Sequence, residues 1–420
     1  MANPDILIVG AGAAGLMAAY TLSKAGKKVM VLEARDRMGG RIHTLHDELF
    51  FKHAELGAEF VHGNLPVTME LLHEAGIEYI SGQGEMWQFR DGKLAKNSWD
   101  MPGWDKMMRK LNDLEEDISI GEFLDQNFSE DQYAELRASV IRFISGYDTA
   151  DPAKASAFAL RDEWGSEEDD AQYRIVGGYR ALAEYLAGES KLNGVEFYLN
   201  SVANHIDHNK TLAKVTLNNG TVYEAGKVIV ALPLGVLQAG AVTFGPAADE
   251  YQKALQQMGF GAIVKLLLEF KEAFWENEDR AFMSFVISGE EIPTWWTQYP
   301  THSTVLTGWL GGLPAEKKKG MTDEEFMHAA IRSLAVIFNR KEEELKDDLV
   351  TWKVANWTTD PFTLGSYVYD TVESHQARKV LSRPINNRIY FASEFIYEGP
   401  AMGTVEAALT SGLDVAKKIV

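Results

Sequence analysis

The first part of the chain alternates short apolar runs with a glycine-rich, helix-like stretch. Ile6–Gly15 reads ILIVGAGAAG, so an apolar run of strand length leads directly into glycines, and Leu16–Ala25 then has a helical pattern. A second apolar run, Val29–Glu33, reads VMVLE and ends in an acid. The pattern predicts a strand, a helix and a second strand, which together form one β-α-β unit.

Similar patterns continue along the rest of the chain. Strands are predicted at Val195–Leu217, Gly226–Pro233, Val264–Phe270, Ala281–Ile287, Thr304–Trp309 and Arg388–Glu394. Helices are predicted at Pro66–Gly76, Asp113–Asp117, Glu130–Arg142, Asp323–Phe338, Glu342–Asp348 and Val405–Val420, and a loop leading into a helix at Ile175–Leu186. Long charged helical stretches between Ile77 and Gln172 predict an inserted, largely helical unit.

The chain length favours two domains, because 420 residues exceed one ordinary hydrophobic core. We expect an α/β protein in which a Rossmann-like domain, built on this β-α-β unit, is interleaved with an α+β domain of mixed sheet and helices. The first domain is expected to comprise residues 1–77, 173–254 and 360–420, and the second residues 78–172 and 255–359.

Three glycines follow the first predicted strand with the spacing GxGxxG. Gly10 would allow a tight turn, Gly12 would let a pyrophosphate approach the backbone, and Gly15 would let the helix pack closely on the strand. The free N–H groups at the helix start would face the diphosphate. Glu33 is placed to accept hydrogen bonds from both ribose hydroxyls of an adenosine and would repel a 2′-phosphate. These features predict a dinucleotide site; the alternative is a glycine-rich turn in another kind of β-α-β unit.

Charge and cysteine content narrow the functional classes. The chain has 61 acidic and 41 basic residues and a formal net charge of −20. This balance argues against binding to nucleic acid or to an anionic membrane surface, and it is compatible with a cationic substrate. The absence of cysteine excludes disulfides, thiolate zinc sites and cysteine nucleophiles.

No targeting, membrane or metal-binding segment is predicted. Residues after Met1 lead almost directly into the first strand, and Asp5 lies where a secretion signal would need basic residues. No apolar run approaches the length of a membrane span, so we expect a cytoplasmic protein. His43 and His46 have no further cluster of ligand-type residues with them, and we expect surface histidines there and no metal site.

Two further segments carry candidate chemistry. Arg35–Arg41 reads RDRMGGR and follows the second strand at once, so its glycines and arginine can wrap a phosphate and give it a counter-charge. Lys265 interrupts the apolar strand Ile263–Leu268, where an uncompensated ammonium would be costly. It is either a functional residue or a strand-edge lysine whose head group reaches solvent.

The motifs, taken in chain order, resemble those of the flavin-containing amine oxidases. They read DILIVGAGAAGL, VLEARDRMGGR, LGAEFVHG, VGGY, VIVALPLGVL, GFGAIVKLLLEF, NWTTDPFTLGSY, IYFASE and GTVEAAL, and they cover nearly the whole chain. The family includes monoamine oxidases, polyamine oxidases and histone demethylase domains. The resemblance implies an FAD domain interleaved with a substrate domain, and oxidation of an amine C–N bond to an imine.

The resemblance also implies which residues contact FAD. These are Gly10, Gly12, Ala13, Ala14, Gly15, Glu33, Ala34, Arg35, Gly39, Gly40, Arg41, Gly57, Ala58, Glu59, Phe60, Val202, Glu394, Gly403, Thr404 and Val405. Within this set, Val202 is expected to contact adenine through its backbone, and Glu394 to lie near the ribityl chain and diphosphate. Thr404 and Val405 begin the last helix, whose N-terminus would point at the pyrimidine end of the flavin.

Three residues are implied to be catalytic: Lys265, Trp357 and Tyr367. Lys265 matches the lysine that holds a water against flavin N5, and Trp357 matches a tryptophan that packs near the flavin. Tyr367 matches one wall of an aromatic slot that orients the amine. Monoamine oxidases have a tyrosine at the second wall, where this chain has Thr404, so the slot is only half aromatic.

Two other positions bear on the cofactor and substrate. Ser366 occupies the place of the cysteine that tethers flavin in monoamine oxidases, so FAD is expected to be non-covalent. His62 is a candidate substrate-pocket residue, because some polyamine oxidases have a histidine in a similar turn; the alternative is a hydrogen-bonded structural histidine.

The implied reaction transfers hydride from the amine to flavin N5; oxygen then reoxidises the flavin to give hydrogen peroxide, and water converts the imine to an aldehyde or ketone. Two alternatives remain. An L-amino-acid oxidase would need an arginine fork for the substrate carboxylate, but Gly57–Phe60 carries an acid, Glu59, in the corresponding turn. The second alternative is a flavoprotein that acts as a scaffold, in which FAD has only a structural role.

Overall fold

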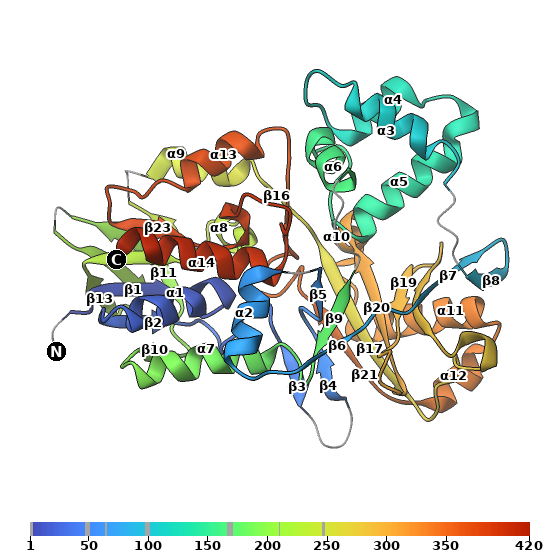
Figure 1. Cartoon of the computed structure of the whole chain (residues 1–420), viewed down its shortest axis with the longest axis horizontal. Coiled ribbons are helices and arrows are strands. Elements are labelled where there is room, and N and C mark those ends of the chain that lie inside the picture. Colours follow the sequence, from blue (N-terminus) through green and yellow to red (C-terminus); the bar gives the residue numbers. More distant parts are fainter. Residues whose placement is uncertain are drawn as a thin grey trace.

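The computed structural model describes residues 3–46, 51–63, 65–96, 101–165, 171–209, 211–245 and 248–420, with the side chains of residues 52 and 53 excepted. Figure 1 shows two bodies side by side, each built around a sheet, with a group of helices above one of them. The described strands form six sheets, and the two largest determine where the main cavity lies.

The first body contains an entirely parallel sheet in the order β10-β2-β1-β14-β23. Its strands are β1 (Ile6–Val9), β2 (Val29–Leu32), β10 (Glu196–Tyr198), β14 (Lys227–Val230) and β23 (Ile389–Phe391). Both faces of this sheet are covered: Ile6 and Ile8 belong to one hydrophobic core, whereas Leu7 and Val9 belong to the other. Burial on both faces explains why the strands read as continuous apolar runs.

Helices cover one face of the parallel sheet, and a smaller sheet with further helices covers the other. On the first face lie α1 (Ala13–Lys24), α2 (Pro66–Glu74), α7 (Arg180–Leu192) and α14 (Val405–Ile419). On the second lie β11 (Ala203–His208), β12 (Ala213–Leu217), β13 (Val222–Ala225) and β15 (Thr243–Phe244), with α8 (Leu234–Gln238), α9 (Asp249–Gln256) and α13 (Ser374–Leu381). This arrangement is a Rossmann-like, three-layer unit (Figure 1).

The second body contains a seven-stranded mixed sheet in the order β21-β17-β20-β19-β18-β7-β8. Its strands are β7 (Glu85–Arg90), β8 (Lys93–Lys96), β17 (Ile263–Phe270), β18 (Met283–Ile287), β19 (Thr294–Trp296), β20 (Val305–Gly311) and β21 (Leu349–Asn356). The helices α10 (Gly312–Lys318), α11 (Asp323–Phe338) and α12 (Glu342–Asp348) contribute buried apolar residues to its core. Strand β17 lies inside the sheet, hydrogen-bonded to β20 on one side and β21 on the other.

Four helices form a separate hydrophobic cluster beside this sheet. They are α3 (Trp104–Asn112), α4 (Ile120–Asn127), α5 (Ala134–Gly146) and α6 (Ala157–Trp164), with the short helix η1 (Asp131–Tyr133) before α5. Figure 1 shows them together above the second body. Helix α5 approaches the mixed sheet where the Trp309 indole donates a hydrogen bond to the Gly146 carbonyl over 2.7 Å.

Three small sheets contain the other described strands. One small sheet contains β5 (Phe60–His62), β9 (Gln172–Ile175) and β6 (Tyr79–Ser81); another pairs β3 (Thr44–His46) with β4 (Lys52–Glu55), and a third pairs β16 (Gly259–Phe260) with β22 (Val368–Tyr369). Two further short helices in the described ranges are η3 (Glu278–Arg280) and η4 (Glu394–Ile396). In the first of these sheets Phe60 is directly opposite Arg174, which brings two segments far apart in sequence together.

Two sequence predictions are wrong in this region. Asp113–Asp117 is a turn between α3 and α4, because its run of acids offers no apolar stripe for packing. The segment from Ile77 to Gln172 begins with the strands β6, β7 and β8, and only its later part is helical. Strands β7 and β8 extend the seven-stranded sheet, a pairing that depends on β18 almost 200 residues later.

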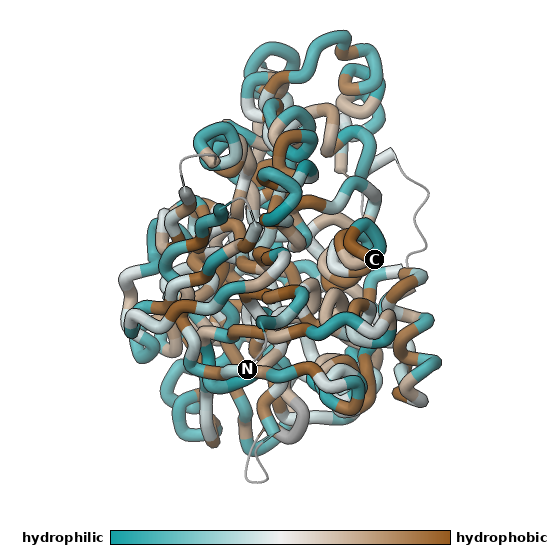
Figure 2. Tube along the Cα trace, turned by 90° about the vertical axis from the view of Figure 1, so that its left-hand side faces the viewer, coloured by the Kyte–Doolittle hydropathy of each residue, from teal (hydrophilic) through white to brown (hydrophobic). Residues whose placement is uncertain are grey.

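The domain boundaries stay a prediction. The parallel sheet draws its strands from 1–77, 173–254 and 360–420, and the mixed sheet draws its strands from 78–172 and 255–359. Figure 2 shows hydrophobic segments mainly toward the middle of the trace and hydrophilic segments along its outside. None of the helices in the described ranges is long and apolar enough to cross a membrane.

Candidate functional site

One large cavity, of about 1850 Å³, extends from the parallel sheet to the mixed sheet. Of the residues singled out in the sequence, its wall contains Gly10, Gly12, Ala13, Ala14, Glu33, Ala34, Arg35, Gly39, Gly40, Arg41, Gly57, Ala58, Glu59, Phe60, His62, Val202, Lys265, Trp357, Tyr367, Glu394, Gly403, Thr404 and Val405. Gly15 is absent from the wall, since it lies beneath the turn. The fold therefore brings candidate positions from the whole chain onto one surface.

The glycine turn packs tightly against the start of α1 on one side and is open toward the cavity on the other. A Cβ atom on Gly15 would lie 2.0 Å from the Gly10 carbonyl oxygen, so only glycine permits this contact between helix and turn. A Cβ atom on Gly12 would meet only the Gly40 Cα, at 4.0 Å. Gly12 is also the N-cap of α1 and supplies no capping side chain. The first N–H groups of α1 have no acceptor within the helix and can therefore bind an anion.

Glu33 is held rigidly at the end of β2. Its buried carboxylate accepts one hydrogen bond from the Ala11 N–H at 2.7 Å and one from the Arg35 N–H at 2.9 Å. A carboxylate offers about four lone-pair sites, so acceptor capacity remains toward the cavity. The position suits recognition of a vicinal diol.

Two of the arginines after β2, Arg35 and Arg41, have carboxylate partners that the sequence did not predict. The Arg41 guanidinium pairs with the Glu394 carboxylate and donates to the Ser366 carbonyl oxygen at 2.7 Å. Burial raises the pKa of Glu394, but the charge of Arg41 outweighs it and holds that pKa below its usual range. Arg35 pairs with Asp360. These two cations therefore hold distant chain segments against the cavity as well as adding positive charge to it.

Lys265 lies deep inside the mixed sheet. Its side chain is 1 % exposed, and its ammonium donates to Glu59 Oε2 at 2.6 Å and to the Gly57 carbonyl oxygen at 3.0 Å. Because β17 is an interior strand and the head group does not reach solvent, the strand-edge alternative is wrong. The indole of Trp296 lies 5.2 Å from the ammonium.

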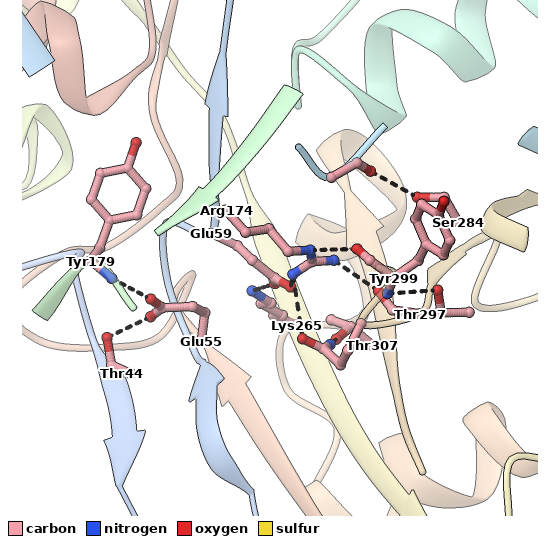
Figure 3. Close-up of polar contacts among 12 residues, drawn as sticks. Thr44, Glu55, Glu59, Arg174, Tyr179, Lys265, Ser284, Thr297, Tyr299 and Thr307 are labelled. Atoms are coloured by element: carbon pink, nitrogen blue, oxygen red, sulfur yellow. Dashed lines mark hydrogen bonds and ion pairs between the residues drawn. The ribbon is translucent and has the colours of Figure 1, made fainter. Parts of the chain in front are cut away.

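Glu59 bridges two buried cations (Figure 3). Its second oxygen accepts from Arg174 in β9, whose guanidinium also donates to the Thr297 carbonyl oxygen at 2.8 Å and to that of Tyr299 at 3.1 Å. Burial raises the pKa of Glu59, but Lys265 and then Arg174 bring it below its usual range. Sequence reasoning missed Arg174; its only sequence signal is a charged residue in the strand before the VGGY motif.

The other implied catalytic residues lie on the same wall. Trp357 is buried and donates from its indole N–H to the Leu56 carbonyl oxygen at 2.8 Å. The Tyr367 hydroxyl donates to the Tyr147 carbonyl oxygen. A Cβ atom on Gly403 would lie 3.0 Å from Tyr367 Cδ2, so the Tyr367 ring packs beside the start of α14, where Thr404 lies. The structure thus places the two predicted walls of the slot close together.

Thr404 and Ser366 both have structural partners. The Thr404 hydroxyl caps α14 by accepting from the Ala407 N–H at 3.3 Å, and it donates to the Ala401 carbonyl oxygen at 2.6 Å. The Ser366 and Thr149 hydroxyls share a hydrogen bond of 2.6 Å. Neither hydroxyl is therefore a free nucleophile in this arrangement.

His62 and two acids complete the wall near Tyr367. The His62 side chain is exposed within the cavity, where desolvation lowers its pKa, so its imidazole is mostly neutral at pH 7; its ring lies 6.4 Å from that of Tyr147. Asp148 and Glu163 both line the cavity. Burial raises the pKa of Asp148, and the charge of Glu163 raises it further. Oδ2 of Asp148 is buried and accepts no hydrogen bond from the described residues. No cation among the described residues therefore pairs with Asp148.

One expectation about histidines is corrected. His43 is only partly exposed, and burial, together with the charges of Arg37 and Arg35, lowers its pKa to about 4. His46 is exposed, as expected for a surface histidine.

Comparison with known proteins identifies the protein family that this chain matches. A family model described as flavin containing amine oxidoreductase matches residues 13–420. The chain is 28% identical to human lysine-specific histone demethylase 2, covering 99% of this chain and 53% of that protein, and 28% identical to polyamine oxidase 2 of Arabidopsis thaliana, covering 99% and 88%. It thus spans about half the length of the demethylase.

Solved structures show the same fold at low sequence identity. A putrescine oxidase bound to putrescine superposes with a TM-score of 0.82 at 22% identity, covering 100% of this chain and 99% of the other. The cyclohexylamine oxidase from Brevibacterium oxydans superposes with a TM-score of 0.79 at 18% identity and covers 100% of both chains. The expected α/β architecture of interleaved parts is therefore confirmed.

Proposed function

This chain belongs to the flavin containing amine oxidoreductase family, and on that premise we propose that it is an FAD-dependent amine oxidase acting on a primary, secondary or polyamine substrate. The observation that carries the proposal is the presence of Lys265 and Tyr367 on the wall of the cavity that also contains the glycine turn. When bound, FAD would supply the acceptor for hydride from the carbon beside the amine nitrogen, would be reoxidised by oxygen with release of hydrogen peroxide, and would leave an imine for hydrolysis to an aldehyde or ketone.

The cavity residues fit a flavin dinucleotide. The open side of Gly12 and the uncapped start of α1 would hold the diphosphate, and Glu33 would hold the ribose. The same wall continues past Gly40 to Lys265, which would lie at the flavin-ring end. We propose non-covalent binding, because the chain has no cysteine for a thioether and Ser366 is hydrogen-bonded to Thr149.

The substrate half of the cavity would favour a neutral reacting amine. The Tyr367 ring and neighbouring apolar groups exclude water, and desolvation favours the uncharged form of an amine. His62, neutral at pH 7, adds no competing positive charge at this wall. Positioning of the amine would therefore depend on shape and on the Tyr367 ring, with no separate catalytic base required.

We further propose that the substrate carries a second cationic group. Asp148 and Glu163 line the cavity beside Tyr367, and their mutual repulsion and burial are costs that a bound ammonium would remove. The polyamine oxidase and the putrescine-bound neighbour support a diamine or polyamine in preference to a monoamine.

The remaining alternatives have weaker support. An amino-acid oxidase needs a free arginine fork, but each arginine that the structure places on the cavity wall pairs with a carboxylate: Arg35 with Asp360, Arg41 with Glu394, and Arg90 and Arg142 with Glu135. A structural role for FAD would not account for a buried, paired lysine at the cavity wall.

Anaerobic titration of the FAD-loaded protein with amines tests the proposal. We expect diamines or polyamines to bleach the flavin absorbance, and air to restore it with release of hydrogen peroxide. A set of L-amino acids is the control for the main alternative. No bleaching by any aliphatic, aromatic or polyamine substrate would refute the proposed activity.

Substitution of Asp148 by asparagine tests the second-cation site. We expect the KM for a diamine to rise about tenfold, equivalent to about 1.4 kcal/mol, while the KM for a monoamine of the same chain length stays within about twofold. Asp125→Asn is the matched control, because Asp125 is exposed on α4, in the same helical cluster, and is not part of the cavity wall. An equal change for both amines in D148N would contradict charge recognition.

A further inference from the structure

Two buried cations, Lys265 and Arg174, share one carboxylate, that of Glu59. The side chains of Lys265, Glu59 and Arg174 are 1%, 4% and 11% exposed, so the charges interact in a medium that screens them little. With all three ionised, the cluster carries one net positive charge. Such a cluster is costly to bury, and loss of the central carboxylate would leave two unneutralised cations.

We propose that Glu59 is a positioning residue that keeps Lys265 charged and fixed at the cavity wall, and that Arg174 restores the net positive charge that Glu59 alone would cancel. Lys265 would then present a fixed charge to any ligand part that gains electron density, which is the electrostatic arrangement that assists electron transfer into a bound group.

The contacts of Lys265 support the positioning role. An ammonium has three N–H donors, and the structure gives two of them acceptors, Glu59 Oε2 and the Gly57 carbonyl oxygen. The third N–H has no acceptor among the described residues, and Lys265 lines the cavity, so this donor is available to a ligand there. Glu59 thus fixes the direction of the donor as well as its charge.

Arg174 in turn is held by two backbone carbonyl groups outside the cavity and by Phe60 on its wall. Its guanidinium donates to the Thr297 and Tyr299 carbonyl oxygens, and it lies 4.3 Å over the ring of Phe60. These partners are neutral. Among the described residues, Glu59 is the only carboxylate that pairs with Arg174. The backbone after β19 therefore anchors the cluster from the side of the mixed sheet.

Within the described ranges, Glu59 is the only carboxylate that forms an ion pair with Lys265. The residues opposite it in the neighbouring strands are Trp309 and Ala355, which do not titrate. Glu55 is the other acid whose field reaches Lys265, but it accepts from the Tyr179 N–H and from Thr44, and burial raises its pKa to about 7 (Figure 3). Glu59 is therefore the group that determines the charge state of Lys265.

The test compares two substitutions that break the same Glu59–Arg174 contact. Glu59→Gln removes the anion, so the buried ammonium should lose its proton at lower pH; Arg174→Gln removes the competing cation, so Lys265 should keep its proton to higher pH. Protein with ¹³Cε-labelled lysine, without FAD, reports this by NMR titration, with the Lys265 resonance identified by its loss in Lys265→Met. We expect shifts of at least one pH unit in opposite directions.

The basic limb of the pH profile of flavin reduction by the FAD-loaded enzyme should move in the same two directions. A purely structural role would shift neither limb, or both alike, and either result would overturn the proposal. This part rests on the proposed function, whereas the titration does not: opposite NMR shifts in a protein that oxidises no amine would refute the function and keep the charge assignment.

A double-mutant cycle covers the case in which Glu59→Gln is too unstable to titrate. Thermal unfolding of Glu59→Gln, Lys265→Met and the double variant gives the coupling between the two side chains. We expect removal of Lys265 to restore part of the stability lost in Glu59→Gln, because one of the two unpaired cations is gone while Arg174 remains. Glu59→Asp should retain more of that stability than Glu59→Gln. Additive effects of the two single substitutions would overturn the pairing.

Discussion

Replacement of Glu33 by alanine should raise the dissociation constant for FAD about a hundredfold. Two hydrogen bonds from ribose hydroxyls to a buried carboxylate contribute about 3 kcal/mol together, which corresponds to this change in affinity. The substitution also leaves the Ala11 and Arg35 N–H groups without the acceptors that now hold the turn. Titration of the apo-protein with FAD, monitored by the quenching of flavin fluorescence, measures the dissociation constant.

Asp36→Ala is the control for Glu33→Ala, because it removes an exposed carboxylate three residues later in the same loop. Its affinity for FAD should stay within about twofold of the parent, a change of about 0.4 kcal/mol. Circular dichroism of both apo-variants checks that the parallel sheet remains folded. Unchanged FAD affinity in the folded Glu33→Ala variant would contradict the ribose assignment.

Replacement of Lys265 by methionine should slow flavin reduction or reoxidation at least about tenfold, equivalent to about 1.4 kcal/mol or more in activation free energy. Methionine keeps an unbranched apolar chain in β17 but removes the ammonium from the cavity wall. Glu59 keeps Arg174 as its counter-ion, so we expect the variant to fold and to bind FAD. Stopped-flow absorbance, first with amine under anaerobic conditions and then with oxygen, separates the two half-reactions.

Lys353→Met provides the matched control for Lys265→Met. Lys353 is exposed on the neighbouring strand β21, directly opposite Leu267, so the same chemical change is made on the same sheet. Both half-reactions should keep their parent rates in this control. Parent rates in Lys265→Met as well would show that the ammonium has no part in either step.

Local sequence patterns are sufficient to predict the elements that hold the nucleotide end. The apolar run, the spacing of Gly10, Gly12 and Gly15, and the acid after the second strand lie within one β-α-β unit, whose geometry depends on neighbours in the chain. A charge within an apolar strand likewise marks Lys265, because burial of an unpaired ammonium is too costly to occur without a partner. The strands at Gly226–Pro233 and Arg388–Glu394 are recognisable for the same reason, as short apolar runs ending at turns.

The partners of these residues depend on tertiary structure. Arg174 reaches Glu59 through the pairing of β9 with β5, and Arg41 meets a carboxylate 353 positions away. Strand order and register, which arise from packing across the whole chain, determine these contacts, and short-range periodicity carries no information about them. For this reason the glycine turn could be predicted from the sequence, whereas the buried charge cluster and the acid pair beside Tyr367 became visible only in the folded chain.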